Sequence, residues 1–130
     1  MKKISIVTAC YNEEENVIEL INRVRKIMES LSSKYDYEHI FIDNASEDKT
    51  VDLLKSEANS DRRIKIIVNS RNFGHIRSPV YGMMQAKGDV VISLVADLQD
   101  PPKMIVQFVR EYEQGYNIVL AIKKSSQENS

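Results

Sequence analysis

The sequence predicts an α/β fold: a Rossmann-like, mainly parallel sheet with helices on both faces. Two observations predict it. Short β-branched apolar runs alternate with segments of helical period, and no linker, repeat or low-complexity tract divides the chain. Strands of about six residues that alternate with helices favour right-handed crossovers between parallel neighbours. Ligands of such sheets bind beyond the carboxyl ends of the strands, so the residues after each strand are candidates for the site.

Two strand–helix units are predicted in the first half of the chain, with strands over 4–9 and 39–43. We expect Asn12 to cap the first helix, with Glu15 three positions later in a capping-box-like start. Ser46 is the expected cap of the second helix. Apolar residues at helical spacing form the predicted buried faces. They are Val17, Leu20, Ile21, Val24, Met28 and Leu31, then Val51, Leu54 and Ala58.

The second half adds predicted strands over 63–68, 90–95 and 117–122, of which 90–95 is the most apolar. Pro79 fits the first position of the third helix with Ser78 as its cap, although an earlier start would place the proline inside the helix. The fourth helix is predicted to open at 101–102 and to close at Gly115. The candidate core residues of these helices are Val80, Met83, Met84 and Ala86, then Met104, Ile105, Phe108, Val109 and Tyr112.

Length and composition bound the function. The chain has 130 residues, enough for one domain or most of one, and a formal net charge of -1. That balance predicts neither a DNA- or RNA-binding surface nor a polybasic patch for an anionic membrane. The single Cys10 cannot form an internal disulfide, which favours a reducing, cytoplasmic location. No apolar run approaches the ~20 residues of a membrane span, and the N-terminus is too short for a signal peptide.

The first predicted strand-to-helix turn argues against several nucleotide-binding folds. Rossmann cofactor sites and P-loops need glycines there, whereas residues 9–14 are bulky and acidic. A nucleotidyltransferase would need a glycine-rich, basic loop at the same place, whereas this loop is acidic. A phosphoacceptor receiver domain needs an aspartate after the third strand, where this chain has Asn69, although Lys123 resembles its lysine.

Asp97 follows the most apolar strand and is the most informative candidate. Side chains alternate along an extended segment, so Asp97 and Gln99 point to the same side and could share one Mg²⁺ or Mn²⁺ ion. The alternative is a strand-end aspartate that bonds backbone amides in a turn. For Asp100, which precedes Pro101, we favour a helix cap over a metal ligand.

Other residues at the strand ends allow two interpretations. Asp43 can accept hydrogen bonds from a base or a ribose, or it can cap the following helix. Arg71 can pair with a diphosphate, or it can be a solvated loop arginine. Cys10 is expected to be a buried thiol without a catalytic task. The aromatic residues Tyr11, Phe73 and His75 could line or stack on a ligand, or simply pack on the helices.

Read together, four strand-end segments carry a resemblance. In order along the chain they are 11–16, 41–50, 71–75 and 96–102. Their order and spacing resemble family 2 glycosyltransferases of GT-A fold, and within these the branch with dolichol-phosphate-mannose synthase and bacterial polyprenyl-phosphate sugar transferases. The resemblance covers residues 4 to 122. Any single motif of the four is weak, whereas four in order at successive strand ends are specific.

The resemblance implies inverting transfer of a sugar from a nucleotide-diphosphate donor to an acceptor such as a polyprenyl phosphate or a saccharide. Asp97 would belong to the family's DxD motif and, with Gln99, hold Mg²⁺ or Mn²⁺ against the donor diphosphate. The implied donor-binding residues are Ala9, Tyr11, Glu13, Asp43, Asn44, Arg71, Gly74 and Asp97. A non-catalytic nucleotide- or protein-binding module that keeps the fold is the alternative.

The sequence departs from the family pattern in three places. At 95–97, the position of the DxD motif, the sequence is Val-Ala-Asp, so the first carboxylate of the motif is missing. At 43–46 the sequence is Asp-Asn-Ala-Ser, where the family commonly has Asp-Asp-Gly-Ser. The acceptor-side half would follow the fifth strand. We therefore expect a truncated donor-binding domain over 1–122, inactive alone, and a disordered polar tail over 123–130. The full-length protein is expected in the cytoplasm or at the cytoplasmic face of a membrane.

Overall fold

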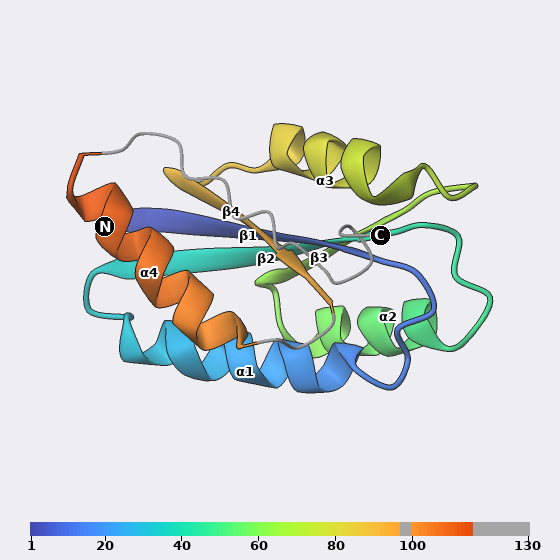
Figure 1. Cartoon of the computed structure of the whole chain (residues 1–130). Helices are drawn as coiled ribbons and strands as arrows, with labels where there is room; N and C mark the ends of the chain where they lie inside the picture. The colour runs from blue at the N-terminus through green and yellow to red at the C-terminus, as the bar shows by residue number, and fades with distance from the viewer. Residues whose placement is uncertain (97–99, 116–130) are drawn as a thin grey trace.

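The computed structural model describes residues 1–96 and 100–115. Within them four strands alternate with four helices, as the sequence predicts (Figure 1). The predicted strand over 117–122 and the tail over 123–130 lie outside the described residues. In the described part, none of the helices is both long and apolar enough to cross a membrane. The elements are β1 Lys2–Cys10, α1 Val17–Ser30, β2 Tyr35–Asp43, α2 Thr50–Ser60, β3 Ile64–Val68, α3 Gly74–Gln85, β4 Val90–Val95 and α4 Pro101–Glu113.

The strands form one parallel sheet in the order β3-β2-β1-β4. Their carboxyl ends are aligned, since Cys10 pairs with Asp43 and Ala9 pairs with Val95. The chain moves outward from β1 to β3 and then returns across the sheet to place β4 on the other side of β1. This reversal creates a topological switch point between β1 and β4, where open α/β sheets bind their ligands.

Helices cover both faces of the sheet, as predicted. In Figure 1, α3 lies above the sheet, whereas α1, α2 and α4 lie below it. The crossover from β3 to β4 runs opposite to the two earlier crossovers, so right-handedness puts α3 on the opposite face. The larger core lies under α1, α2 and α4 and includes Ile6, Leu20 and Phe41. A smaller core of Val7, Ile40 and Ile42 lies under α3.

The predicted caps of the first two helices are wrong. Helix α1 begins at Val17 and α2 at Thr50, four and three residues later than expected. Asn12 has a left-handed backbone, with φ of 52°, and its side chain accepts from the backbone of the second loop instead. The Ser46 hydroxyl likewise bonds Asp43 and accepts from the backbone N–H of Asn12. Both residues join two loops rather than start a helix.

Helix α3 takes the earlier start, with Pro79 inside it. Ser78 faces the sheet and is 1% exposed, and Gly82 lies so close to β1 that an added Cβ would be 2.6 Å from Cγ1 of Val7. Met83 and Ala86 pack on the smaller core as predicted. Val80 and Met84, the other two expected core residues, are 46% and 75% exposed, so that prediction is wrong.

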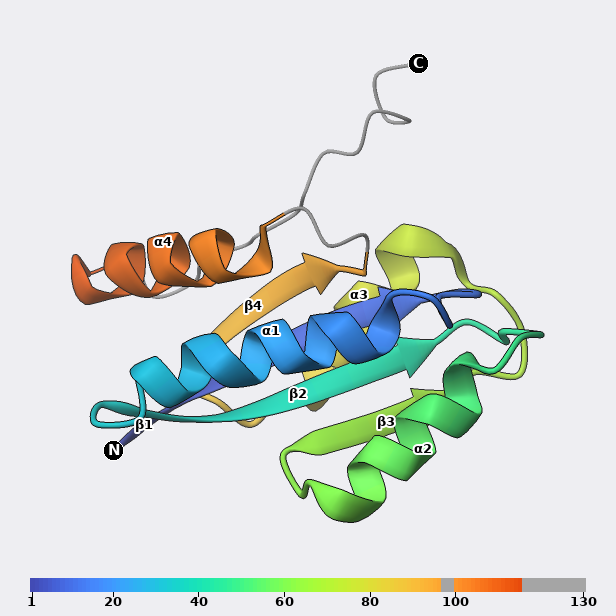
Figure 2. The ribbon, with the colours of Figure 1, turned by 90° about the horizontal axis from the view of Figure 1, so that it is seen from below.

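Helix α4 starts and ends as the sequence predicts. The carboxylate of Asp100 accepts from the backbone N–H of Lys103, which confirms the cap, and Gly115 follows the helix with φ of 106°. Ile105 and Val109 are buried in the larger core, with Met104 and Phe108 packed around them. Figure 2 shows α4 beside α1 on the same face of the sheet.

Candidate active site

A pocket of about 300 Å³ lies at the carboxyl ends of the strands, at the switch point between β1 and β4. It is formed by the loops that follow β1, β2 and β3 together with the end of β4. Five of the eight predicted donor-binding residues line it, namely Ala9, Tyr11, Glu13, Asn44 and Gly74. The aligned strand ends thus bring together residues that are up to 65 positions apart in the sequence.

The loop after β1 is held in place by the loop after β2. The Asn12 side-chain oxygen accepts from the backbone N–H groups of Glu47 and Asp48, at 2.8 and 3.4 Å. The backbone N–H of Glu13 donates to the Thr50 hydroxyl at 2.8 Å. These bonds fix the backbone directly after Tyr11, a residue that lines the pocket and is 44% exposed. The first loop is therefore a preformed wall.

Asn44 connects the second loop to α3. Its side-chain oxygen accepts from the Ser78 hydroxyl, from the Asn69 amide at 3.0 Å and from the backbone N–H of Phe73 at 3.4 Å. Its amide nitrogen donates to the carbonyl of Gly74 at 3.3 Å. The side chain is thus committed to bonds within the protein, and Asn44 shapes the pocket by positioning the start of α3.

Asp43 lies beneath the pocket and is not among the residues that line it. Its carboxylate accepts from the backbone N–H and the hydroxyl of Ser46, at 2.9 and 2.5 Å, and the residue is fully buried. Cys10 lines the pocket, with its sulfur 3.8 Å from the Asp43 carboxylate. Burial, together with the charges of Asp43 and Glu13, raises the pKa of the Cys10 thiol, so it stays protonated. This fits a thiol without a catalytic task.

Arg71 is exposed outside the pocket wall, with its guanidinium 4.7 Å from the centre of the Phe73 ring. Among the described residues that line the pocket, Glu13 alone carries a charge, and none is a lysine or an arginine. A diphosphate in this pocket would therefore need a cation from elsewhere. Arg71 and a metal ion are the candidates that the sequence offers.

Asp97, predicted to be catalytic and to bind a metal ion, and Gln99, predicted as the second metal ligand, lie outside the described residues. The chain reaches them directly from Val95 and Ala96, which both line the pocket. Val95 is 37% exposed there, so the position of the missing DxD carboxylate carries an exposed apolar side chain. In the described part, no three histidine, cysteine or carboxylate side chains come together as a metal site.

Four residues that line the pocket were not predicted to bind a ligand: Cys10, Asn72, Val95 and Ala96. Two of them, Val95 and Ala96, stand directly before Asp97, so their position in the sequence could have indicated them. The role of Ser78 at Asn44 was also missed, because its hydroxyl was expected to cap a helix. Only the packing of α3 against the second loop shows the contact.

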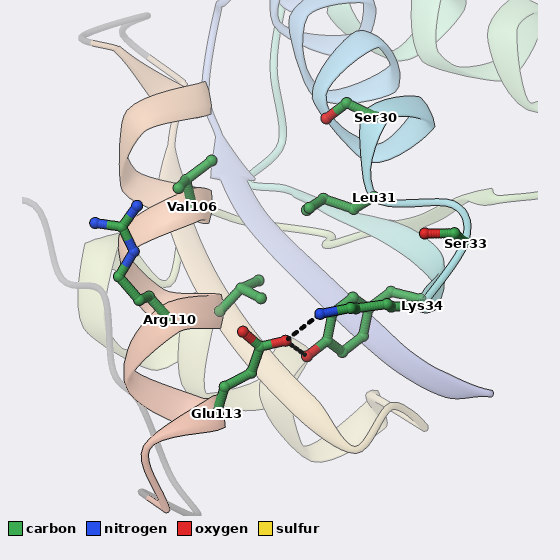
Figure 3. A pocket seen from close by; sticks show the side chains of 9 residues that line it. Ser30, Leu31, Ser33, Lys34, Val106, Arg110 and Glu113 are labelled. Atoms are coloured by element: carbon green, nitrogen blue, oxygen red, sulfur yellow. Dashed lines mark hydrogen bonds and ion pairs between the residues drawn. The ribbon is translucent and has the colours of Figure 1, made fainter.

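A second hollow, of about 280 Å³, lies between the end of α1 and α4. Figure 3 shows the side chains that line it. The Tyr35 hydroxyl donates to the Glu113 carboxylate at 2.7 Å, and the Lys34 ammonium lies 3.9 Å from it. Burial and the bond to Glu113 raise the pKa of Tyr35 to about 12. None of the predicted site residues lines this hollow, which lies at the amino-terminal end of β2. Its contacts join α4 to the α1–β2 loop.

The model of the family described as Glycosyl transferase family 2 matches residues 5–130. The chain belongs to this family. A Bacillus subtilis relative named uncharacterized glycosyltransferase YkcC is 37% identical over 119 residues, covering 92% of this chain and 36% of the relative. The undecaprenyl-phosphate 4-deoxy-4-formamido-L-arabinose transferase of Proteus mirabilis is 36% identical over 130 residues, 99% of this chain and 39% of the relative. The chain thus spans less than half the length of these relatives.

Solved structures of low sequence identity share the fold. A mannosyltransferase from Pyrobaculum calidifontis, in complex with GDP-Man and Mn²⁺, superposes with a TM-score of 0.66 at 17% identity, over 83% of this chain and 32% of that one. S. aureus TarS in complex with UDP-GlcNAc gives 0.64 at 23% identity, over 85% and 32%. The predicted GT-A type of α/β fold is thereby confirmed.

Proposed function

We propose that this chain is the donor-binding part of an inverting glycosyltransferase that moves a sugar from a nucleotide-diphosphate sugar to an acceptor. The observation that carries the proposal is the pocket at the switch point, where the loops after β1, β2 and β3 meet the end of β4. Its preformed walls offer Tyr11 for contact with a base and Glu13 as a hydrogen-bond acceptor.

The chemistry of the pocket fits a divalent cation. Among the described residues that line the pocket, Glu13 alone is charged. A bound diphosphate would therefore lie near a carboxylate, and none of these residues is a lysine or arginine that could balance the negative charge. Asp97 and Gln99 follow the pocket-lining Ala96 and carry the oxygen ligands that Mg²⁺ and Mn²⁺ prefer. Such an ion would stabilise the negative charge of a nucleoside-diphosphate leaving group. This chain's own part is to hold the donor in one orientation.

The proposed acceptor is a polyprenyl phosphate at the cytoplasmic face of a membrane. Support comes from the relatives named as undecaprenyl-phosphate sugar transferases. A phosphate acceptor is already anionic, so its reaction needs no general base from the protein, whereas a sugar hydroxyl does. The exposed Val95 at the DxD motif favours a second candidate, a module that binds nucleotides without turnover.

Calorimetric titration of the chain with UDP-sugars and with GDP-mannose, with and without Mn²⁺, tests the proposal. We expect binding of one donor that strengthens with Mn²⁺ and weakens about tenfold or more in Asp97→Asn. Asp52→Asn, which removes the same charge from an exposed position on α2, should bind like the unaltered chain. Absence of binding to every donor, or binding that Asp97→Asn leaves unchanged, would contradict the proposal.

A further inference from the structure

Helix α3 presents most of its large apolar side chains to the outside, although Met83 packs on the smaller core. The side that faces the sheet carries small residues, the buried Ser78 and Gly82. On its outer side Ile76 is 69% exposed and Met84 is 75% exposed, with Val80 between them at 46%. These three residues are four positions apart and form a stripe along the helix. A surface helix usually buries such a stripe, as α1 does with Leu20, Val24 and Met28.

The charged residues of α3 and of the sequence on either side of it are all positive. Residues 62–88 contain six lysines and arginines and no aspartate or glutamate, although the whole chain has a net charge of -1. Arg77 is exposed within the stripe, and Arg71 and Lys87 are exposed just beyond the two ends of α3. In the described residues, none of these three forms an ion pair. The next carboxylate, Asp89, accepts a hydrogen bond from the backbone N–H of Lys3.

We propose that the outer face of α3, made by Ile76, Arg77, Val80, Tyr81 and Met84, docks on the surface of an anionic phospholipid membrane. Apolar side chains that insert at the headgroup boundary, surrounded by arginine and lysine, are what binds a helix in the plane of such a surface. The exposed Tyr81 ring also suits the interface. The total charge gave no expectation of a basic patch, because the acidic residues all lie outside 62–88.

This surface would bring the pocket to the membrane. Helix α3 starts at Gly74, which lines the pocket, and its 12 residues span about 18 Å. The pocket therefore lies within one helix length of a docked bilayer. A lipid-phosphate acceptor would then be near the donor, a consequence that rests on the proposed function. Docking itself needs no nucleotide and can be tested separately.

Sedimentation with sucrose-loaded vesicles tests the proposal, using phosphatidylcholine with ~30% phosphatidylglycerol against phosphatidylcholine alone. We expect the unaltered chain to bind the anionic vesicles more tightly, and to release them as salt rises from about 0.1 to 0.5 M. Each charge near such a surface changes affinity about fivefold, so Arg77→Glu should lower it more than tenfold. The double variant Ile76→Ser, Met84→Ser should lower it about tenfold or more.

Two matched variants serve as controls. Lys26→Glu makes the same charge change on the exposed side of α1, which lies on the opposite face of the sheet. Val68→Ser removes an apolar side chain that is 51% exposed at the end of β3. Both should bind vesicles like the unaltered chain. All variants change exposed residues, and a thermal melt by circular dichroism checks that each is folded. If the double variant is unfolded, Arg77→Glu alone tests the proposal.

Absence of vesicle binding, or equal losses in Arg77→Glu and Lys26→Glu, would overturn the proposal. So would a dimer in sedimentation equilibrium that the double variant abolishes, since α3 would then meet a second copy. Nucleotide titration of the same variants separates this inference from the proposed function. Vesicle binding without nucleotide binding would refute the function and keep the docking surface, whereas the reverse would refute the docking surface.

Discussion

At the scale of single residues, Glu38 shows how one charge is held inside the sheet. Its carboxylate is almost fully buried and accepts from the Ser5 hydroxyl at 2.5 Å, the backbone N–H of Lys87 at 2.8 Å and the Lys65 ammonium at 2.6 Å. Burial alone would raise its pKa. The hydrogen bonds from Lys65, Ser5 and Lys87 outweigh burial and lower the pKa from 4.5 to about 2.

Replacing Glu38 by glutamine should remove part of the acid sensitivity of the fold. A carboxyl whose pKa is lowered by folding stabilises the protein above the unfolded value and loses this contribution as pH falls toward the folded value. For Glu38 that window runs from pH 4.5 down to about 2. At neutral pH the variant should lose about 2–3 kcal/mol of unfolding free energy, because a bonded buried charge is removed.

Urea denaturation at a series of pH values measures both effects. Between pH 4.5 and about 2, Glu38→Gln should lose less stability than the unaltered chain. Glu19→Gln on the exposed side of α1 is the control and should keep the original pH dependence. Identical pH profiles for Glu38→Gln and the unaltered chain would show that Glu38 does not have the bonds described.

Asn44 makes a second prediction at this scale. Asn44→Ala leaves Ser78, Asn69 and the Phe73 N–H without their shared acceptor, so we expect a loss of about 2–3 kcal/mol in stability. Nucleotide affinity should fall as well, because Gly74 is no longer held beside the pocket. Asn44→Asp keeps the acceptor oxygen but cannot donate to the Gly74 carbonyl, so it should recover only part of the stability. Calorimetry and urea denaturation of both variants provide the test, and an Asn44→Ala chain of unchanged stability would contradict it.

The residue scale also shows what the sequence could reveal of the site. Tyr11, Glu13 and Gly74 line the pocket because they directly follow strand ends, and the position of a strand end is a local property that hydrophobic pattern predicts. The bonds of Asn44 to Ser78 join residues 34 positions apart and depend on how α3 packs. No local pattern encodes such a contact.

At the scale of elements, the wrong helix caps have one physical cause. Asn12 and Ser46 are suitable caps by residue type, but each finds a partner in the neighbouring loop. Local capping preferences are worth about 1 kcal/mol, so tertiary bonds readily replace them. Asp100 has no such competitor in the described residues and caps α4 as predicted.

Helix α3 confirms two of its four predicted core residues, Met83 and Ala86, whereas Val80 and Met84 are exposed. Its stripe of Val80 and Met84 has helical spacing, yet Gly82 lies closer to the sheet than any larger residue could. Gly82→Ala should therefore lower the unfolding free energy by about 1–3 kcal/mol, despite the better helix propensity of alanine. Gln85→Ala, at an exposed position of the same helix, should cost nothing. Equal urea midpoints for the two variants would contradict this close packing.

At the scale of the whole molecule, alternation of strand and helix predicts a parallel sheet with both faces covered, and the structure has both. The order β3-β2-β1-β4 could not be read from the sequence, because pairing of strands depends on contacts between distant segments. That order creates the switch point, and the aligned carboxyl ends of the strands bring the described parts of the four predicted segments to one edge. The fold thus explains why the motifs are informative only as a set.

The central claim is that the pocket at the switch point binds a nucleoside diphosphate. A chain of 14.9 kDa suits nuclear magnetic resonance, so backbone amide shifts can be followed while UDP or GDP is added with Mg²⁺. We predict shifts that concentrate in residues 9–13, 44, 72–74 and 95–96. Shifts confined to the hollow between α1 and α4, at 30–35 and 106–113, or no shifts with either nucleotide, would contradict the claim.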